Sequence, residues 1–143
     1  MTIQAQILDL MRMLREETGT AIMLITHDLG VIAELADDVV VMYAGRVVER
    51  ASVTTLFAQP QHPYTIGLLG SIARLDLEQD RLAAIQGQVP NPLAPVTGCR
   101  FHPRCPFAYE RCFRDDPGLL EVGPGQHAAC WRAPLDVNTS LRG

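Results

Sequence analysis

The sequence contains no lysine, and all twelve of its basic residues are arginine. A phosphate-binding P-loop (Gly-x-x-x-x-Gly-Lys-Ser/Thr) therefore cannot lie within this chain. No apolar run approaches the ~20 residues that span a bilayer, and the N-terminus lacks the pattern of a secretory signal. The net charge is −4 and no basic run is present, which argues against nucleic acid as the main partner. We expect a cytosolic protein, or one that docks on a membrane through other subunits.

The apolar content of 48% is ample for a folded core, and its pattern over the first fifty residues predicts an α/β fold. Residues 2–17 carry apolar side chains at helical spacing. Residues 21–26 form a short, almost wholly apolar run, typical of a strand buried on both faces of a parallel sheet. A short helix at 29–36, a second buried strand at 38–43 and a hairpin partner at 46–49 complete the predicted order.

The predicted sheet is incomplete. A doubly buried strand needs neighbours on both edges, and two strands with a hairpin partner do not supply them. We therefore expect the first half to be part of a larger sheet, and the chain to be a truncated or split piece of a longer one. The composition then changes, since Pro and Gly become frequent after the helices predicted to begin at Ser52 and Pro63. The predicted organisation is a partial α/β domain at 1–50, a helical connector at 51–86, an irregular Cys-rich segment at 87–133 and a tail at 134–143.

His27 directly follows the apolar run, within Thr26-His27-Asp28. Ligands of open α/β sheets bind beyond the carboxyl ends of strands, so this histidine is predicted to lie at a ligand-binding position. An imidazole there can donate a hydrogen bond to a phosphate oxygen or hold an attacking water. The alternative is a histidine that caps the next helix or satisfies a loop carbonyl.

All four cysteines lie in the Pro- and Gly-rich segment, with the spacing Cys-x5-Cys-x6-Cys-x17-Cys. Four thiols where apolar burial is weak indicate a crosslink, either a metal centre or disulfides. Disulfides are disfavoured in a reducing cytosol. Structural zinc sites usually contain a Cys-x2–4-Cys pair, which is absent here, whereas iron–sulfur ligand spacings vary widely. The cysteine spacing therefore favours an iron–sulfur cluster, and a zinc site and free or disulfide-paired thiols are the alternatives.

Several residues beside the cysteines are candidates for supporting roles. Three arginines are placed in sequence to offset the negative charge of a four-thiolate cluster, or else are solvated surface charges: Arg100, Arg104 and Arg111. His102 and His127 are near enough in sequence to replace a cysteine ligand, although with four cysteines they more often belong to the surroundings. Trp131 directly follows the last cysteine and is predicted to shield the site from water, or to serve as ordinary core.

Two groups of motifs, taken together, point to a known family. The first is Leu24-Ile25-Thr26-His27-Asp28-Leu29 with the segment 41–49, which resembles the closing part of an ABC nucleotide-binding domain. The second is His62-Pro63-Tyr64-Thr65, then Gly98-Cys99-x-Phe101-x-x-Arg104-Cys105-Pro106 and the two later cysteines. The second group resembles the C-terminal extension of the ATP-binding subunits of oligopeptide/dipeptide ABC importers, and it is the more specific. The resemblance covers residues 2 to about 133.

This resemblance implies a complete subunit that binds ATP with Mg²⁺, in which His27 contacts the γ-phosphate as a catalytic and cofactor-binding residue. It also implies that some members carry a 4Fe–4S cluster in the extension, with zinc as the alternative here. The implied metal ligands are Cys99, Cys105, Cys112 and Cys130. The implied partners are a second ATP-binding subunit, transmembrane permease subunits and a peptide-binding protein, at the cytoplasmic face of the bacterial inner membrane.

The Q-loop, the signature motif and the catalytic glutamate of this family are missing from the sequence along with the P-loop. We therefore expect no ATPase activity from this polypeptide by itself. The competing interpretation is a stand-alone metal-binding or redox module with no part in transport. Under that interpretation the first fifty residues should form a complete sheet.

Overall fold

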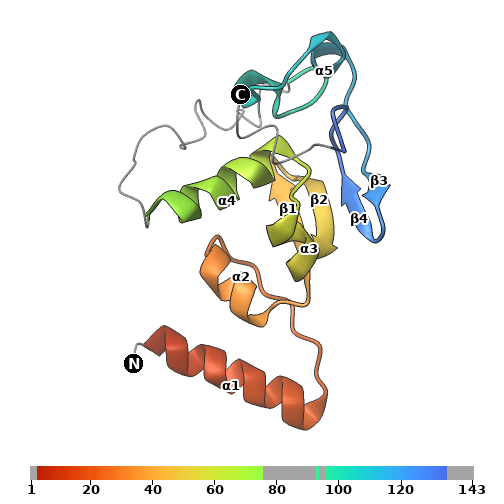
Figure 1. The fold of residues 1–143 in the computed structure, drawn as a ribbon. Helices are drawn as coiled ribbons and strands as arrows, with labels where there is room; N and C mark the ends of the chain where they lie inside the picture. The colour runs from red at the N-terminus through yellow and green to blue at the C-terminus, as the bar shows by residue number, and fades with distance from the viewer. Residues whose placement is uncertain (1–2, 76–92, 94–95, 135–143) are drawn as a thin grey trace. The chain divides into compact units, whose positions relative to one another are not determined.

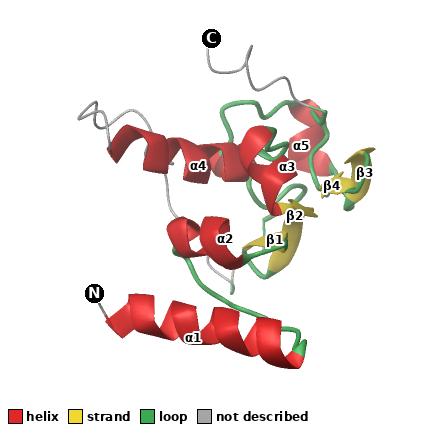
Figure 2. Cartoon of the chain, turned by 60° about the horizontal axis from the view of Figure 1, so that its bottom comes forward, coloured by secondary structure: helices red, strands yellow, loops and turns green. Residues whose placement is uncertain are grey.

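The computed structural model describes residues 3–75, 93 and 96–134 (Figure 1). The chain divides into two compact units, residues 1–37 and 38–143. Its elements are short helices and an antiparallel sheet (Figure 2), a mixture compatible with the predicted α/β class. None of the helices within the described ranges has the length and apolar content that crossing a membrane requires.

The N-terminal unit is a pair of helices. The first, α1 (Ile3–Thr18), ends where Gly19 adopts a positive φ of 67° and donates its N–H to the carbonyl of Arg15. The second, α2 (Leu29–Leu35), begins after Asp28, whose side chain accepts hydrogen bonds from Gly30 N and Val31 N. Both helices agree with the sequence prediction to within one residue at each end, while the predicted start at Thr2 lies outside the described residues.

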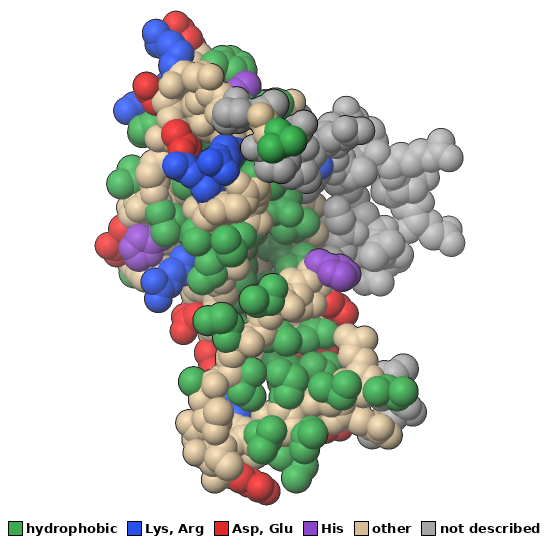
Figure 3. Space-filling view, turned by 180° about the vertical axis from the view of Figure 1, so that it is seen from behind, with side chains coloured by type: hydrophobic (Ala, Val, Ile, Leu, Met, Phe, Trp, Pro, Cys, Tyr) green, Lys and Arg blue, Asp and Glu red, His purple; other side chains and the backbone are tan. Residues whose placement is uncertain are grey.

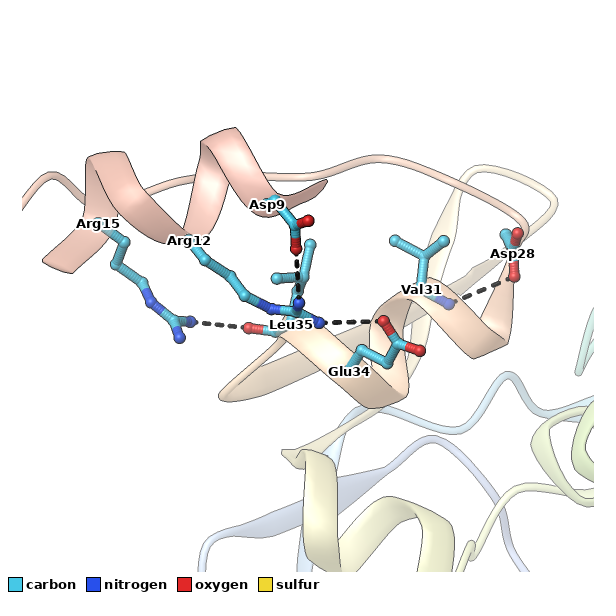
Figure 4. Close-up of polar contacts among 7 residues, drawn as sticks. All are labelled: Asp9, Arg12, Arg15, Asp28, Val31, Glu34 and Leu35. Atoms are coloured by element: carbon cyan, nitrogen blue, oxygen red, sulfur yellow. Dashed lines mark hydrogen bonds and ion pairs between the residues drawn. The ribbon is translucent and has the colours of Figure 1, made fainter. Parts of the chain in front are cut away.

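Polar contacts join the two helices (Figure 4). Arg12 pairs with Glu34 at 3.0 Å, and Arg15 donates to the carbonyl of Leu35 at 2.8 Å. The second contact lies at the C-terminus of α2, where unpaired carbonyls favour a positive charge. These contacts are at least partly exposed, so they orient the helices more than they stabilise them.

The segment 21–26 is not a strand, and this prediction is wrong. Its side chains are exposed, with Met23 and Ile25 at 89% and 90%. A strand needs backbone partners on a neighbouring strand, and no such pairing involves 21–26 within the described part of the chain. Figure 3 shows hydrophobic side chains gathered in the open on this unit. The apolar run therefore lacks the sheet that its composition requires.

The C-terminal unit is built on a sheet of strand order β1-β2-β4-β3, with all neighbours antiparallel. Its strands are β1 (Asp38–Tyr43), β2 (Arg46–Ser52), β3 (Leu120–Gly123) and β4 (Gln126–Ala128). The predicted hairpin between the first two strands is confirmed. Ala44 and Gly45 form its turn with positive φ values of 50° and 78°, the backbone of a tight hairpin.

β1 is half-exposed, contrary to the predicted burial on both faces. Val39 and Tyr43 are buried while Val40 and Met42 are exposed. The reason is its position, because β1 is an edge strand that pairs with β2 alone among the described strands. The hairpin of β3 and β4 was not predicted, since its strands are only four and three residues long.

The remaining helices are α3 (Val53–Ala58), α4 (Pro63–Leu75), the 3-10 turn η1 (His102–Arg104) and α5 (Glu110–Arg114). Both predicted helix starts are confirmed, because Ser52 Oγ accepts from Thr55 N at 3.2 Å and Pro63 is the first residue of α4. The short helical turn expected within 75–85 and the tail expected at 134–143 lie outside the described residues, apart from their first residues.

Candidate functional site

Phe101 attaches the Cys-rich segment to the sheet. Its ring lies edge-on to Tyr43 of β1, with centroids 5.1 Å apart, and contacts Tyr64 of α4 at 5.7 Å. Only 2% of Phe101 is exposed, and Cys99 and Cys105 pack against the same cluster. The segment thus has few apolar residues but places one large aromatic at the centre of the core.

Gly98 brings two cysteines together. Its φ is +77°, and a Cβ at this position would lie 2.4 Å from the carbonyl oxygen of Cys112 and 2.7 Å from the carbonyl carbon of Phe113. Only glycine permits this approach. As a result Cys99 N donates to Cys112 O at 2.9 Å, which joins the loop to α5. Sequence reasoning quoted Gly98 without giving it a role, although a glycine directly before the first cysteine was the available signal.

All four cysteines are free thiols that line one small cavity of about 10 Å³, roughly the space of one water molecule. Cys112 is buried, and the other three are partly buried. In the described ranges, no group of three or more Cys, His, Asp or Glu residues is placed to hold a metal ion as the side chains stand. The structure therefore brings the four predicted ligands around one point without setting them in ligand geometry.

Burial favours the protonated form of three of the thiols, those of Cys99, Cys105 and Cys130. Burial raises the pKa of Cys105 to about 12, and the negative charges of the three neighbouring thiols, when ionised, raise it further. Burial likewise raises the pKa of Cys99 and of Cys130. A cation that binds these sulfurs must therefore displace protons, so its affinity should increase with pH.

Trp131 and Arg132 line the cavity beside the thiols. Trp131 donates its indole N–H to Asp115 O at 2.8 Å, and the guanidinium of Arg111 lies over its ring at 3.6 Å. Arg132 donates to Phe107 O at 3.0 Å, while its backbone N–H donates to Cys130 Sγ at 3.4 Å. The position of Trp131 agrees with the predicted shield. Sequence reasoning missed Arg132, which directly follows Trp131.

The three arginines singled out from the sequence do not line the thiol cavity. Arg100 donates to the carbonyl of Ala44, and Arg104 donates to the Tyr43 hydroxyl at 3.2 Å. Arg111 stacks on the outer side of the site, as described above. Arg100 and Arg104 thus join the Cys-rich segment to β1 and the turn that follows it, whereas Arg111 contacts a residue of the same segment. The role of offsetting thiolate charge stays a prediction.

The two histidines considered as substitute ligands differ in position. His102 lines the thiol cavity, with its ring edge-on to Phe113 at 4.8 Å. Its Nδ1 is buried and has no hydrogen-bond partner among the described residues. His127 lies on β4, opposite Arg50 of β2 and Glu121 of β3, and is not among the residues that line the cavity.

A buried polar cluster, unforeseen from the sequence, supports the site. Glu49 of β2 is fully buried and accepts from His62 N at 2.7 Å, Gln61 N at 2.9 Å and Gln126 Nε2 at 3.1 Å. Burial raises the pKa of Glu49, and the two backbone N–H groups oppose this rise. His62 is also buried, and burial lowers its pKa to about 4, so its imidazole is neutral at pH 7. This cluster fixes one wall of the thiol cavity, which His62 lines.

His27 belongs to the N-terminal unit and is exposed, in the loop directly before α2. The next residue, Asp28, forms hydrogen bonds with residues that precede it. Its backbone N–H donates to Thr26 Oγ1 at 3.0 Å, and its Oδ2 accepts from Gln4 at 3.2 Å. The hydrogen bond from Gln4 is the main cause of a lowered pKa for Asp28. The catalytic role given to His27 stays a prediction.

Comparison with known proteins shows what the chain is similar to. Residues 48–112 match the family model described as "Oligopeptide/dipeptide transporter, C-terminal region". The chain is 54% identical over 138 residues to the probable peptide ABC transporter ATP-binding protein y4tR of Sinorhizobium fredii, a match that covers 96% of this chain and 41% of that protein. It is 53% identical over 130 residues to the oligopeptide transport ATP-binding protein AppD of Bacillus subtilis, covering 91% and 40%. OppD of Escherichia coli, also an oligopeptide transport ATP-binding protein, is 48% identical over 131 residues, covering 92% and 39%.

The chain is homologous to the ATP-binding proteins of peptide ABC transporters. The resemblance seen in the sequence is thereby confirmed at this level. The chain spans about two fifths of the length of the first two relatives. The family-model match includes Cys99, Cys105 and Cys112 and ends before Cys130.

Proposed function

We propose that this chain forms the C-terminal part of the ATP-binding subunit of a bacterial oligopeptide or dipeptide importer. The observation that carries the proposal is the 54% identity with a peptide ABC transporter ATP-binding protein along 96% of the chain. In the complete subunit, ATP would bind with Mg²⁺ and its hydrolysis would drive transport. This sequence, which has no lysine and hence no P-loop, should not hydrolyse ATP by itself.

The proposed assembly follows from the same relationship. The complete subunit would act with a second ATP-binding subunit, with transmembrane permease subunits and with a peptide-binding protein. It would lie at the cytoplasmic face of the inner membrane, held there by the permease. The exposed apolar side chains of the N-terminal unit support an incomplete domain, since Met23 and Ile25 are exposed at 89% and 90%.

Within this assembly we assign His27 to the γ-phosphate of ATP. Its exposed side chain is accessible to a ligand, and the hydrogen bonds of Asp28 to Thr26 and Gln4 restrict the loop that carries it. A histidine so placed can act through a hydrogen bond to phosphate or to the attacking water. Such a group changes the rate of hydrolysis more than the affinity for the nucleotide.

A chimera tests this role. The matching segment of AppD from Bacillus subtilis is replaced by this chain, and His27→Ala is compared with His127→Ala, a change on β4. We expect His27→Ala to lower ATP hydrolysis by ~100-fold or more, with ATP affinity within about twofold of the parent. His127→Ala should hydrolyse at the parent rate. Unchanged turnover in His27→Ala would refute the assignment.

We propose in addition that Cys99, Cys105, Cys112 and Cys130 bind one metal centre. The supporting observation is that all four thiols line the same small cavity. At about 10 Å³ the cavity has room for a single ion, which the cysteine side chains would have to turn toward, whereas a 4Fe–4S cluster requires them to move outward. Iron–sulfur remains the leading assignment and zinc the alternative. When bound, the centre would crosslink a loop-rich segment that has little apolar core of its own.

Metal analysis of anaerobically purified chain tests the centre. A 4Fe–4S cluster predicts iron and acid-labile sulfide in equal amounts with a broad absorption band near ~400 nm, and the alternative predicts one zinc per chain. Cys105→Ser should lose most of the metal, while His102→Gln, which changes a non-cysteine side chain lining the same cavity, should keep it. Wild-type protein that contains neither metal, even after reconstitution with iron and sulfide or with zinc, would contradict the proposal.

A further inference from the structure

A second and larger cavity lies in the C-terminal unit, with a volume of about 300 Å³. Its walls come from β2, from the Cys-rich segment beside Phe101 and from the loop 116–119 that precedes β3. This volume is at the lower end of the ~300–1,000 Å³ typical of small-molecule sites. His27, the residue assigned to ATP, belongs to the N-terminal unit, and of the four cysteines proposed to bind a metal only Cys99 also lines this cavity.

The charged groups of this cavity carry an excess of positive charge. Arg46 and Arg100 both line it, and Asp116 is the one carboxylate among its lining residues. Asp116 forms an ion pair with Arg46. Arg100 donates to the carbonyl of Ala44, and no carboxylate lies within ion-pair distance of it among the described residues. Among the described residues, one partly buried guanidinium therefore has no counter-charge at the cavity wall.

The buried histidine at this cavity leaves the excess of positive charge unchanged. His62 lines the cavity and is buried, so it contributes no positive charge that would compete with Arg100 and no negative charge that would cancel it. Guanidinium groups in such partly buried positions bind carboxylates through short, charge-assisted hydrogen bonds. The electrostatic preference of the cavity is thus for a small anion.

The rest of the lining is apolar and aromatic. Tyr43 and Phe101 form part of the wall, and Leu119 lies at the cavity with 40% of its surface exposed. Tyr43 and Phe101 are already buried, so it is Leu119 that an inorganic anion would leave against water and that an apolar group attached to the anion would cover. A guanidinium with no carboxylate partner in the described part of the chain, beside an exposed apolar side chain, selects an amphiphilic acid.

We propose that this cavity binds a small organic carboxylate that carries an apolar group. The carboxylate accepts hydrogen bonds from Arg100, and the apolar group packs against Leu119. The proposal concerns this chain alone and does not depend on ATP hydrolysis or on the identity of any metal. Its ligand class follows from the charge and the lining of the cavity.

Calorimetric titration of the full chain with 3-phenylpropanoate tests the proposal. We expect saturable binding, with affinity at least ~10-fold weaker for the neutral amide of the same acid and for acetate, which lacks the apolar group. Arg100→Gln should weaken binding of 3-phenylpropanoate ~10-fold or more, because it removes a charge-assisted contact. The matched control is Arg114→Gln on α5, which lies outside the cavity and should bind like the parent.

A second variant keeps the proposal testable should Arg100→Gln unfold. Leu119→Ala shortens an exposed side chain, so the fold should persist, and it should weaken 3-phenylpropanoate about threefold without changing acetate binding. Circular dichroism confirms folding of each variant. Equal affinity for the acid and its amide would overturn the proposal. So would equal affinity of the Arg100→Gln and Arg114→Gln variants, or the absence of saturable binding.

Discussion

At the scale of single residues, one glycine determines whether the cysteines meet. The positive φ of Gly98 and the 2.4 Å that would separate its Cβ from the Cys112 carbonyl leave no room for a side chain. The contact is between backbones, so a larger residue cannot be accommodated by a change of rotamer. Gly118 is a suitable comparison, since a Cβ there would meet nothing within 4 Å.

We predict that Gly98→Ala destabilises the C-terminal unit by about 3 kcal/mol, the sum of the left-handed backbone and the steric overlap. Chemical denaturation followed by tryptophan fluorescence measures the change, since the only tryptophan, Trp131, lines the thiol cavity. Gly118→Ala should change the free energy of unfolding by less than about 0.5 kcal/mol. Equal stability of the two variants would refute the role given to Gly98.

A second prediction at this scale concerns pH. The pKa of His62 is about 4 in the folded chain, below the 6.5 of a free histidine, because burial disfavours the charged form. The unfolded chain therefore binds the proton first as the pH falls, and stability present above pH 6.5 is lost between pH 6.5 and 4. At pH 5 the loss should be about 2 kcal/mol.

The comparison of wild type with His62→Gln isolates this contribution. Glu49 acts in the opposite direction, because its raised pKa favours folding as the pH falls, and it is present in both proteins. Free energies of unfolding at pH 7 and pH 5 give the difference. An identical decrease in both proteins would show that His62 is not the group responsible.

At the scale of elements, Glu49 connects three segments far apart in the sequence. From β2 it accepts the N–H groups of Gln61 and His62 that precede α4, and the side-chain amide of Gln126 on β4. The N-terminal end of a helix has unpaired donors and favours a negative charge, which Glu49 supplies from outside the helix. The buried carboxylate thus fixes the two residues that precede α4, while His62 Nδ1 accepts from Tyr64 N in the first turn of the helix.

We predict that Glu49→Ala releases this end of α4, because the buried donors lose their acceptor, at a cost of about 2 kcal/mol. Amide hydrogen exchange should become faster at Gln61 and His62 by ~10-fold or more, while α3 changes little. Glu121→Ala, on the exposed edge strand β3, is the control and should leave these amides unchanged. Unchanged exchange in Glu49→Ala would contradict the role given to Glu49.

The elements that the sequence predicts are those whose signals are local. Ser52 predicts the start of α3 and Pro63 the start of α4, and the Ala44-Gly45 turn predicts the β1–β2 hairpin. The β3–β4 hairpin depends on pairing with β2, more than seventy residues away, which no local pattern shows. The run 21–26 has the composition of a buried strand and fails to form one, because strand formation depends on partners that the described chain does not supply.

The candidate site, too, could be predicted from the sequence only in part. The four cysteines were identified from residue type and spacing, and they line one cavity. Their immediate surroundings were not foreseen, because the direction of each side chain is set by tertiary contacts. Arg132 lines the cavity in place of Arg100, and Glu49 fixes a wall from a strand that precedes the cysteines by fifty residues or more.

At the scale of the whole molecule, the two units differ in how well they bury apolar surface. The C-terminal unit has a core around Tyr43, Val48 and Phe101. In the N-terminal unit the stripe of α1 is open, with Ile3, Ile7 and Leu10 all exposed. Exposed apolar surface of this extent indicates an unfilled interface. Under the proposed function, the remainder of an ATP-binding domain would cover this surface, since the chain spans about two fifths of the length of the first two relatives.

The central claim is that this chain can serve as the C-terminal part of a peptide importer's ATP-binding subunit, and peptide uptake tests it most directly. Cells of Bacillus subtilis that lack AppD receive the chimera in which this chain replaces the matching segment of that protein. We predict peptide uptake restored to within about threefold of cells given intact AppD, and lost again with His27→Ala. A chimera that is folded and assembled with its permease but supports no uptake would contradict the account.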